Sequence, residues 1–129
     1  MHKDIILCVD DEPIVVRACT TAITMAGFRA ATAENGAAGL ESFMELKDEV
    51  CLVLSDVILP AVNGLDMVER ILQVKPDVKI LLMSGYNESI IEQRGRNRFP
   101  FIRKPFIYRV LIDKIQSIVG DPDAAASGT

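Results

Sequence analysis

The stretch IILCVDDEP, residues 5–13, decides the fold class of this chain. Its first five residues are all apolar, which is typical of a strand that is covered on both faces in a parallel sheet. Three acids, Asp10, Asp11 and Glu12, follow directly. Because adjacent carboxylates repel one another and lose hydration next to apolar surface, this strand end is predicted to meet a positive charge.

Apolar runs and helical patterns alternate along the rest of the chain. In the first helical segment the apolar residues recur every three or four positions, which places them on one helix face. Strict alternation of this kind predicts an α/β fold with an open, doubly wound parallel sheet of five strands and with five helices. The predicted strands are residues 5–9, 28–32, 51–55, 79–83 and 100–103, and the predicted helices are 13–26, 35–47, 65–75, 87–94 and a segment after Pro105.

Length and composition favour one packed domain. The chain has 129 residues, of which 50% are hydrophobic, so residues 1–120 can enclose a core. Residues 121–129 are small and polar, which predicts a disordered tail or linker. No apolar run approaches the roughly 18 residues of a membrane span, and the first ten residues do not form a signal peptide. We therefore expect a cytoplasmic protein without membrane insertion.

Three cysteines, Cys8, Cys19 and Cys51, lie inside apolar stretches without CxxC spacing. They are expected to be buried small hydrophobic residues rather than zinc ligands. The helical patterns add further residues that are expected to face the core, among them Met44, Ile107 and Val110.

Polar residues follow four of the five predicted strands. Asp10 and Asp11 follow the first strand, Asp56 the third, Ser84 the fourth and Lys104 the fifth. The carboxyl ends of parallel strands meet at one edge of a sheet, which is where open α/β sheets bind their ligands. These side chains are therefore predicted to form one cluster.

The chemistry of this cluster points to phosphoryl transfer. Three carboxylates in close proximity repel one another, which raises their pKa values or requires a cation, and oxygen ligands without His or Cys suit Mg²⁺. Lys104 adds a second positive charge, and Ser84 adds a hydroxyl donor for the same anion. Asp56 is the best nucleophile candidate, because it stands alone whereas Asp10 and Asp11 form a natural metal pair. Glu12 is interpreted as a residue of the first helical turn rather than as a metal ligand.

Four motifs in order give the chain a family resemblance. They are VDDEP after the first strand, SDVILPAVNG around Asp56, LLMSGY with Ser84, and FIRKPF with Lys104. Over about residues 3–119 the chain resembles a response regulator receiver domain, the phosphoacceptor domain of two-component signalling. The resemblance implies a flavodoxin-like sheet of order 2-1-3-4-5.

The resemblance also implies a role for each matching position. Asp56 would carry the phosphoryl group as an aspartyl phosphate, and Ser84 and Lys104 would contact it. Ser84 and Phe101 would form the switch, and a cis bond would precede Pro105. The implied Mg²⁺ ligands are Asp10, Asp11, Asp56 and the backbone carbonyl of Ile58.

The implied function is a phosphorylation-dependent signalling switch in a two-component system or phosphorelay. A histidine kinase or histidine phosphotransfer protein would donate the phosphoryl group, and a downstream output protein or domain would sense it. A phosphorylation-dependent dimer is possible within this family. The domain would assist its own phosphorylation and dephosphorylation without being a turnover enzyme.

Other functions have less support from the sequence. An α/β phosphatase with an aspartate nucleophile normally has a DxD arrangement, whereas Asp10 and Asp11 are contiguous. Neither a GxxxxGK[ST] nor a GxGxxG loop is present to bind a nucleotide. The net charge of −4 disfavours direct binding to nucleic acid. A phosphorylation-independent protein-interaction domain of the same fold stays open as the alternative, although no member of the acid, Asp, Ser and Lys set is missing.

Overall fold

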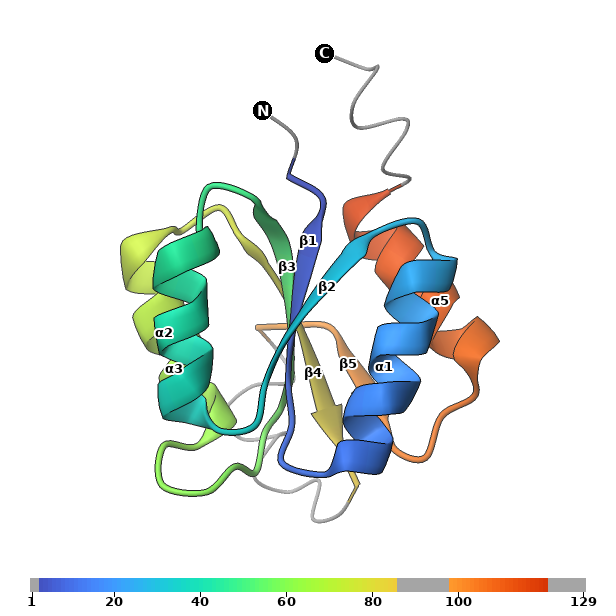
Figure 1. The fold of residues 1–129 in the computed structure, drawn as a ribbon, viewed down its shortest axis with the longest axis horizontal. Coiled ribbons are helices and arrows are strands. Elements are labelled where there is room, and N and C mark those ends of the chain that lie inside the picture. The colour runs from blue at the N-terminus through green and yellow to red at the C-terminus, as the bar shows by residue number, and fades with distance from the viewer. Residues whose placement is uncertain (1–2, 86–97, 121–129) are drawn as a thin grey trace.

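The computed structural model describes residues 3–85 and 98–120 (Figure 1). Five strands and four helices follow one another in the predicted order over these ranges. The helix predicted at residues 87–94 and the tail predicted at residues 121–129 lie outside the described residues. The strands are β1 (Ile5–Val9), β2 (Arg29–Ala33), β3 (Val50–Asp56), β4 (Lys79–Ser84) and β5 (Phe101–Arg103), and the helices are α1 (Pro13–Met25), α2 (Gly36–Leu46), α3 (Gly64–Val74) and α5 (Tyr108–Val119).

All five strands are parallel and form one sheet in the order β2-β1-β3-β4-β5, which confirms the expected doubly wound fold. The strand β1 lies between β2 and β3, because the chain adds β2 on one side of β1 and then crosses to add β3 on the other. This reversal of direction is the switch point at which sheets of this type bind ligands.

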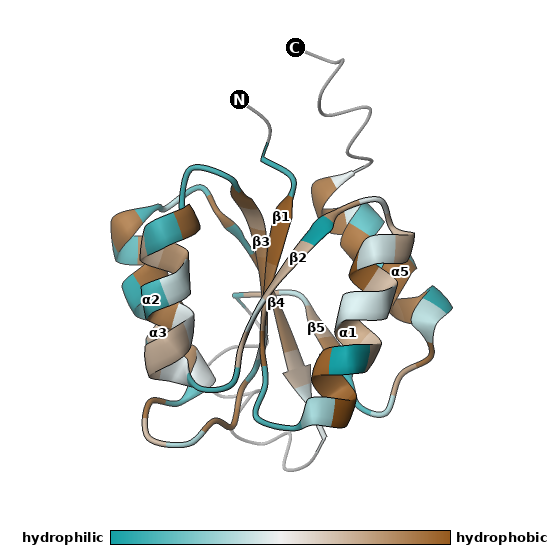
Figure 2. Cartoon of the chain, viewed as in Figure 1, coloured by the Kyte–Doolittle hydropathy of each residue, from teal (hydrophilic) through white to brown (hydrophobic). Residues whose placement is uncertain are grey.

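The sheet is covered by helices on both faces. Figure 1 shows α1 and α5 on one side of the sheet and α2 and α3 on the other. Alternate residues of β1 enter two separate cores: Leu7 packs on the α2 and α3 side, and Ile6 and Cys8 pack on the α1 and α5 side. Burial on both faces explains why β1 is apolar at every position. Figure 2 shows the apolar colour of the central strands and the mixed apolar and polar colours of the helices on either side.

Two helices begin at asparagine caps. The side chain of Asn35 accepts a hydrogen bond from the Ala38 N–H at 2.7 Å, and Asn63 accepts one from the Asp66 N–H at 2.9 Å. Each cap satisfies one of the backbone donors that the first helical turn leaves unpaired. None of the helices in the described ranges has the length and apolar content needed to cross a membrane.

Burial of the cysteines agrees with the prediction, whereas three apolar residues were wrongly expected in the core. Cys8 and Cys19 are buried and Cys51 is partly buried, all as free thiols.

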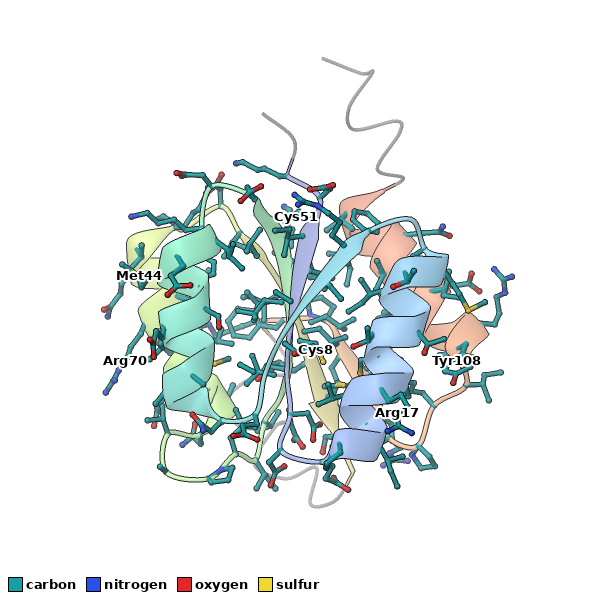
Figure 3. All side chains as sticks on the ribbon, viewed as in Figure 1. Cys8, Arg17, Met44, Cys51, Arg70 and Tyr108 are labelled. Carbon is teal, nitrogen blue, oxygen red and sulfur yellow. The ribbon has the colours of Figure 1, made fainter. Side chains whose placement is uncertain are left out.

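Met44 is 48% exposed, on the outer side of α2 (Figure 3), because the buried face of α2 runs through its two glycines and Phe43. Ile107 and Val110 are exposed because Ile107 precedes α5 and the buried face of that helix is centred on Leu111, Ile112 and Ile115.

Candidate functional site

The register of the sheet brings the predicted polar residues together. Val9 pairs with Ser55 across β1 and β3, so the next residue of each strand, Asp10 and Asp56, emerges at the same level. Across β3 and β4, Asp56 pairs with Met83, which places Ser84 one step further along the same edge. Asp10, Asp56 and Ser84 are all buried. The predicted convergence of these residues at one edge of the sheet is confirmed.

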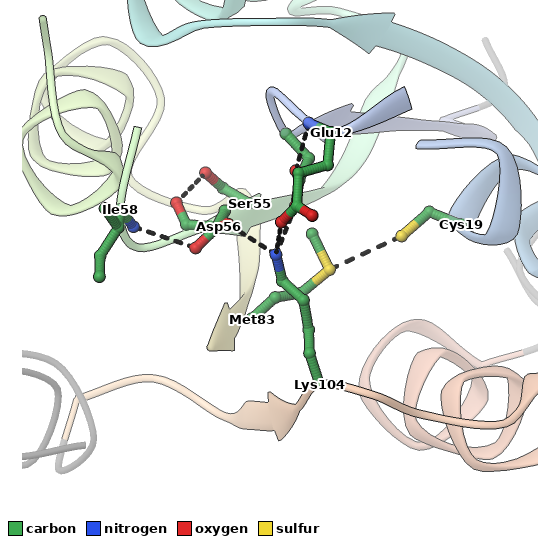
Figure 4. Close-up of polar contacts among 8 residues, drawn as sticks. Glu12, Cys19, Ser55, Asp56, Ile58, Met83 and Lys104 are labelled. Atoms are coloured by element: carbon green, nitrogen blue, oxygen red, sulfur yellow. Dashed lines mark hydrogen bonds and ion pairs between the residues drawn. The ribbon is translucent and has the colours of Figure 1, made fainter. Parts of the chain in front are cut away.

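Lys104 forms the centre of this cluster (Figure 4). Its Nζ donates hydrogen bonds to Oδ2 of Asp10 at 2.9 Å and to Oδ2 of Asp56 at 2.7 Å. The lysine side chain is only 12% exposed, so both ion pairs are largely shielded from solvent. Such charge-assisted bonds are stronger than neutral ones and fix the carboxylates in place. Lys104 therefore supplies a positive charge at the end of β1, where the sequence predicted that the acids would meet one.

The second oxygen of each carboxylate is held by the backbone. Oδ1 of Asp10 accepts the Glu12 N–H at 2.9 Å, and Oδ1 of Asp56 accepts the Ile58 N–H at 3.0 Å. Each bond spans two residues, which is the local turn that aspartate side chains favour. The resemblance implies a metal-binding role for the carbonyl of Ile58, and the N–H of the same residue orients Asp56.

The electrostatic environment perturbs two of these groups. Burial raises the pKa of the Asp10 carboxyl, and the hydrogen bonds from the Glu12 N–H and from Lys104 counter this only in part. Burial by itself would lower the pKa of the Lys104 ammonium, but its hydrogen bonds to Asp56 and Asp10 outweigh burial, so that its pKa is raised. Lys104 is therefore a cation over the whole physiological pH range.

Four acids lie close enough together to hold a metal ion. Single oxygen atoms of Asp10, Asp11, Glu12 and Asp56 all lie within 4.8 Å of one another. A donor set made only of carboxylate oxygens fits Mg²⁺ and does not fit softer metals. Sequence reasoning missed one member of this cluster, Glu12. It was predicted in the first helical turn, but it lies one residue earlier, as the N-cap of α1. Its carboxylate lies 3.4 Å from Lys104 Nζ.

The loop that follows β3 depends on a close backbone approach at Gly64. Its N–H donates to the Val57 carbonyl at 2.8 Å. A Cβ atom at this position would lie 1.9 Å from the Asp56 carbonyl oxygen, so only glycine fits without backbone movement. The glycine thus returns the loop to the start of α3 close to the backbone of Asp56.

The residues predicted to form the switch lie on β4 and β5. Ser84 is buried, and its carbonyl accepts the Lys104 N–H at 2.7 Å, which connects the ends of these two strands. Phe101 is partly buried and packs against the core on the α2 and α3 side. The Lys104–Pro105 peptide bond is cis, as the resemblance implied. Among residues 3–85 and 98–120, an alanine Cβ at Gly85 would meet only the Lys104 Cβ, at 3.9 Å.

A cavity gives solvent access to this cluster. It has a volume of about 690 Å³ and opens over Asp56 and Lys104, with Asp11 and Glu12 on its wall. The remaining wall is mostly apolar and is formed by the start of α1 and by the loop before α5. A small anion can therefore reach the carboxylates and the lysine from outside.

A comparison with known protein families shows which family has this arrangement of residues. The family described as "Response regulator receiver domain" matches residues 6–116. The chain belongs to this family. Receiver domains are the regulatory signalling domains of two-component response regulators. Residues 6–116 of this chain match that domain.

Several known proteins are similar to this chain in sequence or fold. The chemotaxis protein CheY of Thermotoga maritima is 34% identical over 104 residues, which cover 78% of this chain and 85% of CheY. The sensor kinase CckA of Brucella abortus is 29% identical over 120 residues, or 92% of this chain, and the chain spans only 13% of CckA. A crystal structure of the CheX-CheY-BeF3-Mg+2 complex from Borrelia burgdorferi shares the fold at a TM-score of 0.79 and 21% identity, covering 88% of this chain and 87% of that one.

Proposed function

We propose that this receiver domain is a phosphorylation-dependent switch that accepts a phosphoryl group on Asp56 from a phosphohistidine. The donor would be a histidine kinase or a histidine phosphotransfer protein. The observation that carries the proposal is the bridge of Lys104 between the buried carboxylates of Asp10 and Asp56, at the edge of an open cavity. A lysine, a hydroxyl and a carboxylate cluster at one point are the groups that phosphoryl transfer to a carboxylate requires.

Mg²⁺ is the proposed cofactor. Asp10, Asp11 and Asp56 would hold it through their carboxylates, and Ile58 through its backbone carbonyl. The mutual approach of the carboxylate oxygens to within 4.8 Å supports this assignment, as does the lack of nitrogen or sulfur donors among them. When bound, Mg²⁺ supplies positive charge that balances the transferring phosphoryl group.

The proposed reaction transfers one phosphoryl group between two side chains. A carboxylate oxygen of Asp56 attacks the phosphorus in line, and an O–P bond forms as the P–N bond of the phosphohistidine breaks. The electron pair of the broken bond stays on the imidazole nitrogen. Lys104 and Ser84 donate hydrogen bonds to the phosphoryl oxygens and stabilise the charge that they carry. The product is an aspartyl phosphate at Asp56.

The added charge would then bias the conformation of the site. Nζ of Lys104 donates to the two buried carboxylates of Asp10 and Asp56, and a new dianion beside it would compete for its donors. The proposed response is a change in the packing of Ser84 and Phe101, which lie on the adjoining strands β4 and β5. Phe101 has no hydroxyl group, so its part in the switch would depend on packing alone.

The setting of the domain is part of the proposal. Residues 1–120 would form the receiver and residues 121–129 a tail or linker, in a cytoplasmic protein that neither inserts into membranes nor binds nucleic acid directly. A downstream protein or domain would read the switch, and phosphorylation could promote a dimer. The Borrelia CheY complex contains BeF3 and Mg+2, which supports the use of these two reagents as probes of this chain.

Mass spectrometry tests the nucleophile. Incubation with acetyl phosphate and Mg²⁺ is expected to add the mass of one phosphoryl group to the wild-type chain, and the Asp56→Asn variant is expected to gain none. Asp113→Asn, which removes an exposed aspartate of α5, is the matched control and should label like the wild type. Undiminished labelling of Asp56→Asn would overturn the assignment. If the wild type neither labels nor binds beryllofluoride with Mg²⁺ present, the phosphorylation-independent interaction domain is the better description.

A further inference from the structure

Glu12 has a place in the site that its position in the sequence does not reveal. It is the N-cap residue of α1, yet its side chain makes no hydrogen bond to the first turn of that helix. Its Oε1 instead lies 3.4 Å from Nζ of Lys104. The side chain is 63% exposed, in contrast to the buried carboxylates of Asp10 and Asp56 that contact the same nitrogen.

The three carboxylates around Lys104 differ in how readily they can leave it. An ammonium group has three donors, and its three acidic neighbours in the described part of the chain match that number. Asp10 and Asp56 are buried, so withdrawing the lysine from either leaves a carboxylate with little solvent to replace it. Glu12 reaches water directly. A phosphoryl oxygen that approaches Lys104 therefore displaces Glu12 at the lowest cost.

The charge of Glu12 also acts on both ions that the site is proposed to hold. Its carboxylate oxygen lies within 4.8 Å of the oxygens of Asp10, Asp11 and Asp56. A negative charge at this distance attracts a divalent cation among those oxygens and repels an anion attached to Asp56. The two effects have opposite signs, which makes them separable by experiment.

We propose that Glu12 is a positioning residue that holds the third donor of Lys104 in the unphosphorylated state, favours the bound cation and opposes the phosphoryl anion. This inference rests on the proposed function of the site. It assigns to Glu12 a role in setting how readily the domain accepts and keeps a phosphoryl group.

The Glu12→Gln variant tests the inference because it removes the charge and keeps the shape. The backbone N–H that Glu12 donates to Asp10 is retained. Isothermal titration with Mg²⁺ alone is expected to give about three- to fivefold weaker binding, which is the range for a largely exposed charge interaction. Titration with beryllofluoride at saturating Mg²⁺ is expected to give about three- to fivefold tighter binding. Glu45→Gln, an exposed glutamate of α2, is the matched control and should change neither affinity.

The conservative variant separates charge from contact. Glu12→Asp keeps the negative charge but shortens the side chain by one methylene, so it should retain most of the Mg²⁺ affinity while the contact with Lys104 is lost. Beryllofluoride should then bind with an affinity between those of the wild type and Glu12→Gln.

Opposite changes in the two titrations support the inference. Weaker binding of both ligands in Glu12→Gln would mean a purely structural role and would overturn it, as would unchanged binding of both. Failure of the proposed function is distinguishable, since the wild type itself would then take up no beryllofluoride. Even in that case, an unchanged Mg²⁺ affinity in Glu12→Gln overturns the role of Glu12 in cation binding, and a weakened one supports that role.

Discussion

Replacing Lys104 by methionine removes the cation that two buried carboxylates share. Methionine retains most of the apolar stem of lysine, so the change tests the charge rather than the packing. Lys104 Nζ lies 2.9 Å from Asp10 and 2.7 Å from Asp56, and the lysine side chain is 12% exposed. We expect the variant to be markedly less stable at pH 7 in the absence of divalent cations.

The size of this loss follows from the burial of the partners. Removing one member of a buried ion pair typically costs about 3–5 kcal/mol, because the other charge is left uncompensated. Asp10 and Asp56 each keep one hydrogen bond from a backbone N–H, which places the expected loss near the lower end, at about 3 kcal/mol. For a domain of this size that corresponds to a melting temperature lower by roughly 10 °C.

The pH dependence identifies the cause. Burial raises the pKa of Asp10, and loss of the lysine removes an interaction that lowers it, so the pKa in the variant rises further. A carboxyl whose folded-state pKa lies above its unfolded value of 3.8 stabilises the fold below that value and loses this contribution as pH rises through the raised pKa. The deficit of Lys104→Met should therefore be small below about pH 4 and reach its full size near neutrality. In the wild type, the raised pKa of Lys104 keeps its contribution until strongly alkaline pH.

Urea unfolding monitored by circular dichroism, at pH 4 and pH 7, with EDTA or with excess Mg²⁺, measures these effects. Mg²⁺ should stabilise the variant more than the wild type, because the lysine no longer repels the cation, and binding at a hundred times the dissociation constant adds about 2.7 kcal/mol. Lys79→Met, at the exposed first residue of β4, is the control and should stay within about 0.5 kcal/mol of the wild type. An equal loss at both pH values without extra stabilisation by Mg²⁺ would refute the electrostatic reasoning.

Three further predictions concern the scaffold and use the same unfolding measurement. Gly64→Ala places a Cβ 1.9 Å from the Asp56 carbonyl oxygen and should cost more than about 2 kcal/mol. Gly85→Ala, whose nearest contact in the described part of the chain is at 3.9 Å, should stay within about 0.5 kcal/mol, and equal effects of the two variants would contradict the geometry. Asn35→Ala removes a helix cap and should cost about 1 kcal/mol, and a neutral result would show that water satisfies the freed N–H equally well. Phe43→Ala empties a fully buried site and should cost about 3–5 kcal/mol of unfolding free energy. A loss below about 1 kcal/mol would contradict this and would show that the core collapses around the gap.

Much of the candidate site could be predicted from the sequence, because the register of a parallel sheet follows from simple rules. Asp56 and Ser84 each end a strand, Asp10 and Lys104 directly follow one, and parallel strands end at one edge. Their convergence is confirmed, while their roles in phosphoryl transfer and metal binding stay predictions. The contact of Glu12 with Lys104 could not be predicted. It depends on where α1 begins and how far a lysine that follows β5 reaches across the edge, and neither leaves a periodic signal.

The amino-acid sequence by itself determined the alternation of strands and helices, the burial of β1 on both faces and the set of polar residues at the carboxyl edge. These depend on local patterns of apolar residues and on the order of elements, which the chain carries directly. The tertiary structure alone decided that Lys104 bridges Asp10 and Asp56, that Glu12 joins them, and that Ile107 and Val110 face solvent. Such outcomes depend on distances of a few ångströms between residues far apart in the chain, and on the rotation of each helix against the sheet.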